Sequence, residues 1–204
     1  MKLYFSPGAC SVGIHVLLEE IGKPYEAVKL SFAEQEQYKP AFTSINPKSK
    51  VPTLVRDDGS VLTEYPAIAY YLAATNPEAG LLPQGPEKLA AAMEATDYAV
   101  ATIHMQGFSR IFRPANFTPN ETEHEAVKAR GREIAQKALG IMDQRMAGKE
   151  YVAGEYSFAD SALFYVSWWN NRLKLDLPPN VAAHYARMRA RPAVQRTLAA
   201  EGLA

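Results

Sequence analysis

The chain has 204 residues, of which 48% are hydrophobic and 22% are charged, a composition typical of a globular protein with a sizeable core. Its 22 basic residues balance its 22 acidic residues, so the formal net charge is zero. A nucleic-acid-binding protein usually carries a marked positive excess, so no nucleic-acid partner is expected.

Cys10 is the single cysteine, so the chain cannot form an internal disulfide bond. The N-terminus lacks the pattern of a secretory signal, and both observations favour a cytoplasmic location. The most apolar run, 162–169, is far too short to span a bilayer, so no membrane partner is expected. No spacing of histidines and cysteines resembles a metal site, so no metal is expected either.

The first 75 or so residues alternate strand and helix signals. Asp57-Asp58-Gly59-Ser60 lies between two short apolar runs, which is typical of a β-hairpin. Pro66 fits the first turn of a helix, where its missing N–H does no harm. The expected order is βαβ, then α, then a ββ hairpin, then α, with strands at 2–5, 25–30, 53–56 and 61–63, helices at 11–21 and 67–74, and a weakly helical segment at 31–42.

Beyond a Pro/Gly-rich segment at 76–86, the pattern is helical almost throughout. Ser157 followed by Asp160 resembles a capping box that opens a helix. Further helices are expected at 89–112, 123–146, 181–191 and 194–201. The predicted fold class is therefore an α/β domain followed by an all-α domain, with limits at 1–77 for the first domain, 78–86 for the linker and 87–204 for the second domain.

Cys10 follows a strand and a Ser-Pro-Gly turn and directly precedes the first expected helix. At a helix N-terminus, unpaired backbone N–H groups and the helix dipole favour a thiolate over a thiol. The sequence therefore predicts a reactive sulfur at this junction.

Several short motifs are distributed along the whole chain. They are Pro7-Gly8-Ala9-Cys10-Ser11, Asn46-Pro47-Lys48 with Val51-Pro52-Thr53-Leu54, Asp57-Asp58-Gly59 with Leu62-Thr63-Glu64, Ala67-Ile68 with Tyr71-Leu72-Ala73, His104, Gly107-Phe108-Ser109, Phe158-Ala159-Asp160 and Ala200-Glu201-Gly202-Leu203. In this combination the chain resembles the glutathione S-transferases, most closely the bacterial beta class. The resemblance implies a thioredoxin-like domain that binds glutathione as co-substrate, and a helical domain that shapes a pocket for a small hydrophobic electrophile. It also implies a homodimer and a role in detoxification.

The resemblance further implies roles for individual residues. Cys10 and His104 would be catalytic. Glu64 would meet the ammonium group of glutathione, and Val51, beside a cis Val51–Pro52 bond, would pair with the tripeptide like an added strand. Lys50 stands where relatives usually have glutamine and could still reach the glycyl carboxylate as a point charge. Asp97 would contact glutathione bound to the partner subunit. The full set implied to bind glutathione is Ala9, Cys10, Ser11, Lys50, Val51, Pro52, Glu64, Tyr65, Asp97 and His104.

Structural interpretations of the same residues remain open. Pro52 could begin a strand in the trans form, Glu64 could simply complement a helix dipole, and Lys50 could be a solvated lysine. Tyr65 departs from the small residue usual in relatives, so its ring must turn away from the ligand. Asp97 also departs from the family, in which asparagine is typical.

The histidines need separate interpretation. His104 is expected to share an apolar stripe of its helix with Met93, Asp97, Ala101 and Phe108, and a lone histidine on such a face is more often a core residue. The resemblance instead places His104 close to the sulfur. The other histidines are expected to be structural: His15, within reach of Glu19 one turn on, and His124 and His184.

Two reactions are compatible with this site. Glutathione thiolate could attack an electrophilic carbon, or Cys10 could form a mixed disulfide with glutathione and take part in thiol–disulfide exchange. Two alternatives stay open. One is a non-enzymatic protein of the same fold, such as a stringent-response or transcription-associated factor or a carrier. The other is a glutathione-dependent dehalogenase or isomerase.

Overall fold

A computed structural model describes residues 1–204. The chain forms two compact units, an N-terminal unit of residues 1–82 together with 188–204, and a helical unit of residues 83–187. The final segment, which the sequence pattern grouped with the helical domain, lies in the N-terminal unit because its helix packs on the first helix of the chain. The domain limits expected at 77 and 87 stay predictions.

The N-terminal unit contains a four-stranded sheet in the order β2-β1-β3-β4. The central strand β1 pairs in parallel with β2 and antiparallel with β3, and β3 pairs antiparallel with β4 across the predicted hairpin. Gly59 supplies the positive φ, 81°, that this turn requires. The expected strands are confirmed, with bounds β1 Lys2–Phe5, β2 Glu26–Lys29, β3 Thr53–Val55 and β4 Val61–Thr63.

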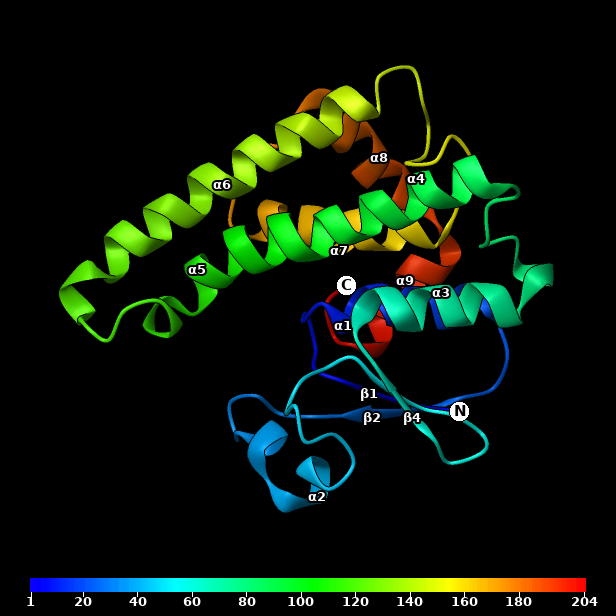
Figure 1. The fold of residues 1–204 in the computed structure, drawn as a ribbon, viewed down its shortest axis with the longest axis horizontal. Helices are drawn as coiled ribbons and strands as arrows, with labels where there is room; N and C mark the ends of the chain where they lie inside the picture. The colour runs from blue at the N-terminus through cyan, green and yellow to red at the C-terminus, as the bar shows by residue number, and fades with distance from the viewer. The chain divides into compact units, whose positions relative to one another are not determined.

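Helices α1 (Ser11–Ile21) and α3 (Tyr65–Thr75) lie on one face of the sheet, and α2 (Pro40–Thr43) lies on the other side (Figure 1). Side chains of a strand alternate between faces, so Leu3 and Phe5, both buried, point opposite to Tyr4. Tyr4 packs on Phe42, with ring centroids 5.4 Å apart. Tyr4 is therefore part of the packing beside α2. The short helices η1 (Glu36–Tyr38) and η2 (Pro77–Ala79) complete the connections.

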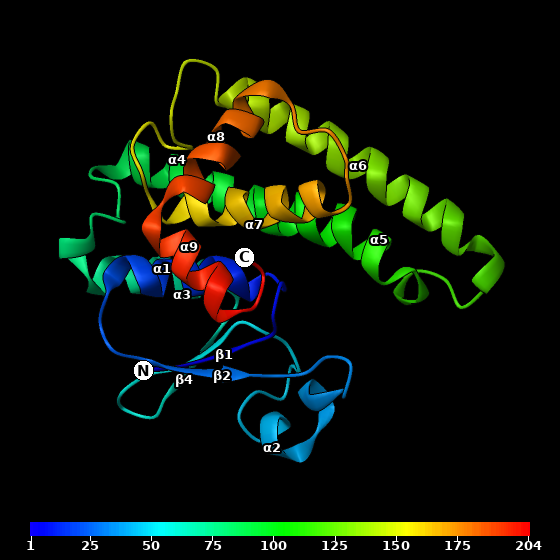
Figure 2. The ribbon, with the colours of Figure 1, turned by 180° about the vertical axis from the view of Figure 1, so that it is seen from behind.

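The C-terminal helix α9 (Pro192–Ala200) packs along α1 (Figure 2). Two ion pairs join these segments near the end of α1, where Arg191 Nε lies 2.6 Å from Glu20 Oε1 and Arg196 Nε lies 2.7 Å from Glu19 Oε2. Helix α1 itself ends at Gly22, whose left-handed backbone lets its N–H donate to the carbonyl of Leu18.

The helical unit begins with one continuous helical segment, as predicted for 89–112, but its winding changes along the way. Its parts are α4 (Pro86–Asp97), the π-helical segment η3 (Tyr98–Phe108) and α5 (Ser109–Phe112). The remaining helices are α6 (His124–Arg145), α7 (Phe158–Arg172) and α8 (Pro179–Ala190), with short helical turns η4 (Pro114–Asn116) and η5 (Glu121–Glu123). None of the helices combines the length and the hydropathy that a bilayer-spanning segment requires.

The apolar stripe expected around His104 is wrong. Met93, Asp97 and Ala101 are exposed, and His104 is half-buried. The buried face instead carries small residues because α6 crosses this segment closely, so that a Cβ on Gly131 would lie 2.7 Å from the carbonyl oxygen of Gly107. A π-helix also bonds five residues back rather than four, so α-helical spacing does not mark one face of it. The buried residues of α4 and η3 are Ala92, Ala95, Thr96, Ala99, Ile103, Gly107 and Phe108, so Phe108 is the one member of the expected stripe that is buried.

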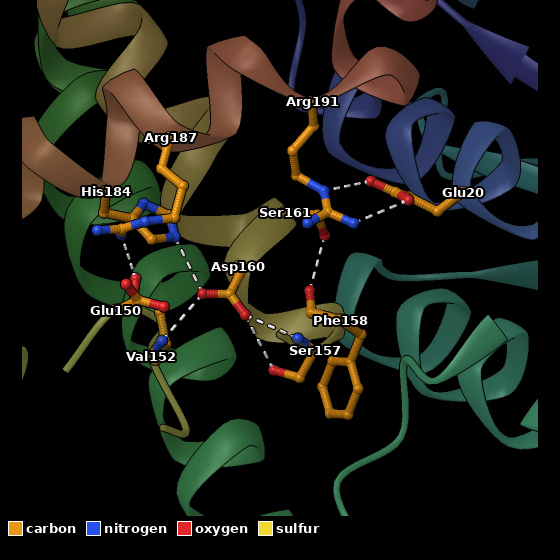
Figure 3. A network of polar contacts seen from close by, with 10 residues as sticks. All are labelled: Glu20, Glu150, Val152, Ser157, Phe158, Asp160, Ser161, His184, Arg187 and Arg191. Atoms are coloured by element: carbon orange, nitrogen blue, oxygen red, sulfur yellow. Dashed lines mark hydrogen bonds and ion pairs between the residues drawn. The ribbon is translucent and has the colours of Figure 1, made fainter. Parts of the chain in front are cut away.

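The predicted capping box at the start of α7 is confirmed. Asp160 Oδ2 accepts a hydrogen bond from the backbone N–H of Ser157 at 2.8 Å. Its other oxygen accepts from the N–H of Val152 at 2.9 Å and lies 2.9 Å from Nε2 of His184 (Figure 3). Asp160, Ser157 and His184 are completely buried. One carboxylate therefore fixes a helix start, a loop and α8 together.

Candidate functional site

The segment before Cys10 is a tight turn. Gly8 has φ of 71°, and the N–H of Ala9 donates to the carbonyl of Ser6 at 3.0 Å. Proline followed by a residue with positive φ is typical of a type II turn. Ser11 Oγ donates to the Ser6 carbonyl and accepts from the Ser6 N–H, both at 3.3 Å. Ser11 is completely buried in this arrangement, and its expected contact with glutathione stays a prediction.

Cys10 is the N-cap residue of α1, which confirms the helix-start position inferred from the sequence. Its sulfur is partly buried and donates to the carbonyl oxygen of Val51 at 3.4 Å. The Val51–Pro52 bond is cis, as predicted. Ala9 packs on the small apolar cluster that contains Val51. The structure thus brings Ala9, Cys10 and Val51 together.

The loop that carries Val51 is organised by Asn46, to which the sequence analysis gave no separate role. Its buried amide Nδ2 donates to the carbonyl of Lys50 at 2.9 Å and to Thr53 Oγ1 at 2.8 Å. Thr53 Oγ1 donates to the same carbonyl. The Lys50 backbone is therefore held while its side chain is exposed. An asparagine before proline in a loop is only a weak sequence signal for such a role.

Glu64 occupies an unusual backbone conformation at the N-cap of α3, with φ 70° and ψ 125°. Its carboxylate is exposed and lies 2.7 Å from Lys48 Nζ, which also donates to Thr63 Oγ1 at 2.9 Å. Backbone strain of this kind costs about 1–3 kcal/mol and tends to occur at functional sites. The side chain of Tyr65 is buried, and the expected turn of its ring away from the ligand stays a prediction. Lys48 is an additional candidate that sequence reasoning did not single out.

Asp97 and His104 belong to the helical unit. Asp97 is exposed at the end of α4. His104 lies in η3, and its Nδ1 is 3.3 Å from the hydroxyl of Tyr165. Its ring meets Trp169 edge to face, with centroids 4.7 Å apart. His104 thus has an aromatic surround within its own unit, and its expected approach to the sulfur stays a prediction.

A hollow of about 460 Å³ lies elsewhere in the N-terminal unit, beside Glu19, Lys23, Tyr25 and Arg196. Its charged groups are already paired, since Lys23 lies 2.7 Å from Glu78 and Arg196 lies 2.7 Å from Glu19. Burial, together with the nearby Glu19, raises the pKa of Tyr25 above its usual range. No group of three or more histidine, cysteine or acidic side chains is arranged to hold a metal ion. The Cys10 region therefore remains the candidate site.

Comparison with known proteins agrees with this architecture. The family model described as the glutathione S-transferase N-terminal domain matches residues 8–75, and that of the C-terminal domain matches residues 99–192. Glutathione S-transferase GstA of Escherichia coli O157:H7 is 35% identical over 208 residues, covering 100% of both chains.

Two solved structures extend the likeness to three dimensions. A glutathione transferase homologue from Sulfitobacter, with bound glutathione, has a TM-score of 0.92 at 32% identity and covers 100% of this chain and 98% of that one. A bacterial beta class glutathione S-transferase from Sphingomonas chungbukensis has a TM-score of 0.86 at 34% identity and covers 100% of both chains.

Proposed function

Because this chain belongs to the glutathione S-transferase family, we propose that it is a glutathione transferase, which joins the sulfur of glutathione to a small hydrophobic electrophile. The observation that carries the proposal is the position of Cys10, at the N-cap of α1 with its sulfur on the carbonyl of Val51. Here a tripeptide thiol can meet both a helix N-terminus and the backbone of the Val51 loop.

Glutathione has complementary groups for this region. The N–H of Val51 takes part in none of the chain's own backbone hydrogen bonds, so Val51 can pair with the extended tripeptide. The glutamyl carboxylate fits the N-terminus of α3, because the dipole and the first-turn N–H groups of a helix favour an anion at that end. Its ammonium group fits the exposed carboxylate of Glu64, and Lys50 provides a cation for the glycyl carboxylate.

In the conjugation step, the glutathione thiolate donates an electron pair to an electrophilic carbon. A carbon–sulfur bond forms, and the leaving group departs with the electrons of its own bond. The protein positions the tripeptide and stabilises its thiolate, the roles proposed for Cys10, Ser11 and His104. The electrophile is proposed to contact the aromatic cluster of the helical unit, in which Trp169 contacts His104, Phe108 and Phe112.

Membership of the beta class, a homodimer, a cytoplasmic location and a detoxifying role are parts of the same proposal. The likeness to a beta class structure and the cysteine at the helix start support the first. In a homodimer, the exposed Asp97 would contact glutathione held by the partner subunit. The single cysteine suits a reducing compartment.

Thiol–disulfide exchange is a second candidate activity, favoured by the partly exposed sulfur of Cys10. The Cys10 thiolate attacks the glutathione sulfur of a mixed disulfide between glutathione and a substrate thiol, forms a mixed disulfide with that glutathione and releases the substrate thiolate. A second glutathione thiolate then attacks the mixed disulfide, which regenerates Cys10 and yields glutathione disulfide. Replacing Cys10 by serine abolishes this cycle because no second cysteine exists in the chain.

The decisive experiment combines retention on immobilised glutathione with turnover of an activated aryl chloride. We expect specific elution by free glutathione and a saturable conjugation rate. Glu64→Gln removes the charge that meets the ammonium group, and we expect KM for glutathione to rise about tenfold, as for loss of a charged hydrogen bond. Glu26→Gln is the matched control, because Glu26 is an exposed acid on the edge strand β2, where it pairs with Lys2 of the neighbouring strand.

Several outcomes would contradict the proposal. Absence of both retention and turnover would favour a non-enzymatic protein of this fold. Turnover restricted to halide release or double-bond isomerisation would favour a dehalogenase or isomerase. Equal KM values for Glu64→Gln and Glu26→Gln would remove Glu64 from the glutathione site.

A further inference from the structure

Glu201 is a buried carboxylate that the glutathione chemistry proposed above does not use. It follows α9 as the C-cap residue, and its side chain has no exposed surface. Burying a charged group is unfavourable unless it has hydrogen-bond partners. The partners of Glu201 therefore indicate what this carboxylate does.

Both oxygens of Glu201 bind groups near the start of α1. Oε2 accepts a hydrogen bond from the backbone N–H of Gly8 at 2.9 Å. Oε1 lies 2.8 Å from Nδ1 of His15, whose ring is also buried and packs beside Phe5 and Tyr25. The i,i+4 spacing predicts that His15 reaches Glu19, but Glu19 instead accepts from Tyr25 and pairs with Arg196.

The Gly8 contact bears directly on the turn that carries Cys10. In a type II turn from Ser6 to Ala9, the hydrogen bond that closes the turn uses the N–H of Ala9, so the N–H of Gly8 must find its partner elsewhere. Glu201 supplies that acceptor from the other end of the chain. Gly8 lies two residues before Cys10, so the position of the Gly8 peptide influences where the Cys10 backbone, and with it the sulfur, is placed.

The Glu201 backbone is itself held in place. The N–H of Gly202, with φ of 70°, donates to the carbonyl of Ala199 at 3.1 Å, and the N–H of Leu203 donates to that of Leu198 at 2.7 Å. These two bonds are the pattern of a Schellman motif, which ends a helix with a defined geometry. The carboxylate therefore projects from a rigid helix end.

Glu201 is not the only polar link between α9 and α1. Arg191 and Arg196 pair with Glu20 and Glu19 towards the far end of α1. These two ion pairs already join the helices. Neither of them contacts the turn before Cys10, whereas the hydrogen bond from the Gly8 N–H to Glu201 does.

We propose that Glu201 is a positioning residue, which holds the Gly8 peptide through its carboxylate and thereby sets the Cys10 sulfur against the Val51 loop. His15 fixes the orientation of this carboxylate from α1. This inference deepens the proposed glutathione site and rests on it for its catalytic consequence. The geometric part, the setting of the sulfur, can be tested without glutathione.

The test compares Glu201→Met with Glu201→Gln. Methionine keeps the approximate length but has no strong acceptor, whereas glutamine keeps an oxygen for the Gly8 N–H. Because Cys10 is the only cysteine, its alkylation by iodoacetamide can be followed by intact mass. We expect Glu201→Met to change the alkylation rate and to lower kcat for conjugation about tenfold, since small displacements of reacting groups have effects of this size. Glu201→Gln should restore both quantities to within about twofold of wild type.

Arg196→Gln is the matched control, because it removes a contact between the same two helices without touching the turn. It should leave the alkylation rate unchanged. Wild-type alkylation and kcat in Glu201→Met, or an equal change in Arg196→Gln, would overturn the proposal. If wild type alkylates normally but conjugates nothing, the proposed function fails while the alkylation comparison still tests the positioning role.

Hydrogen exchange of the wild-type protein gives a test that does not depend on any variant folding. An amide bound to a buried carboxylate is protected, so the Gly8 N–H should exchange far more slowly than in an unstructured peptide. Exchange of the Gly8 N–H at the unstructured rate would overturn the proposal.

Discussion

The protein contains two buried histidine–carboxylate pairs, His15 with Glu201 in the N-terminal unit and His184 with Asp160 in the helical unit. Their chemistry is alike. The nitrogen–oxygen distances are 2.8 and 2.9 Å, and the exposed fraction of each side chain is 2% or less. In both pairs, the second carboxylate oxygen accepts from a backbone N–H.

The pairs differ in where along the chain the residue that donates this backbone N–H lies. Asp160 binds the N–H of Ser157, only three residues before it, and so secures the start of its own helix. Glu201 binds the N–H of Gly8, at the opposite end of the chain, in the turn before Cys10. The same pair of side chains thus supports folding in one unit and, by our proposal, the position of a reactive sulfur in the other.

The comparison is tested most strongly by Asp160→Ala. This change leaves His184 and two backbone N–H groups without their buried acceptor, so we expect a loss of about 3–5 kcal/mol in the free energy of unfolding. Urea unfolding at constant protein concentration measures it. The alkylation rate of Cys10 in the folded protein should stay at the wild-type value. A change in that rate as large as in Glu201→Met would remove the contrast between the pairs.

A smaller effect is expected from Gly8→Ala, which tests the turn directly. Gly8 has φ of 71°, and a side chain in this left-handed region costs roughly 1–2 kcal/mol. Thermal or urea unfolding should show that loss, together with altered alkylation of Cys10. Gly140→Ala in α6 is the control, since its Cβ would meet nothing within 4 Å and alanine favours a helix. Equal stability of the two variants would argue against the left-handed turn.

The smallest effect concerns the ion pair between Arg196, which is exposed, and Glu19, which is partly buried. Partial burial opposes ionisation of Glu19, but hydrogen bonds from Tyr25 and Arg196 outweigh it and hold the pKa of this carboxyl below its usual range. A lowered pKa in the folded protein stabilises it above the ordinary value of 4.5, and this stabilisation is lost as the pH falls through the folded value.

Arg196→Gln should therefore lower the free energy of unfolding by about 0.2–1 kcal/mol at pH 7, and by less as the pH is lowered towards 3. Urea midpoints across this range measure the difference. A difference that grows on acidification would have the wrong sign and would contradict the assignment. The contrast with Asp160→Ala separates a partly exposed pair from a fully buried one.

Local patterns predicted much of the fold. Helix α1 and strand β4 have the predicted bounds, and the capping box of Ser157 and Asp160 is present. These features depend on neighbouring residues, such as a turn before a helix or an acid three residues after a serine. The cis bond before Pro52 came from the family resemblance rather than from the pattern alone.

The sequence pattern did not predict which face of the long helical segment 86–112 is buried. Large side chains such as Met93 suggested one face, but close crossing by α6 selected the face with alanine and glycine. The same limitation applied to His15, whose sequence neighbour Glu19 binds other residues. Hydropathy and spacing do not state which distant residue competes for a contact.

By itself, the sequence determined the order of strands and helices, the turn at Gly8 and the position of a lone thiol at a helix start, because each depends on interactions between residues close in the chain. Only the tertiary structure decided that a carboxylate near the C-terminus is buried against that turn. Such a contact depends on how α9 packs on α1, and no local preference of either segment specifies it.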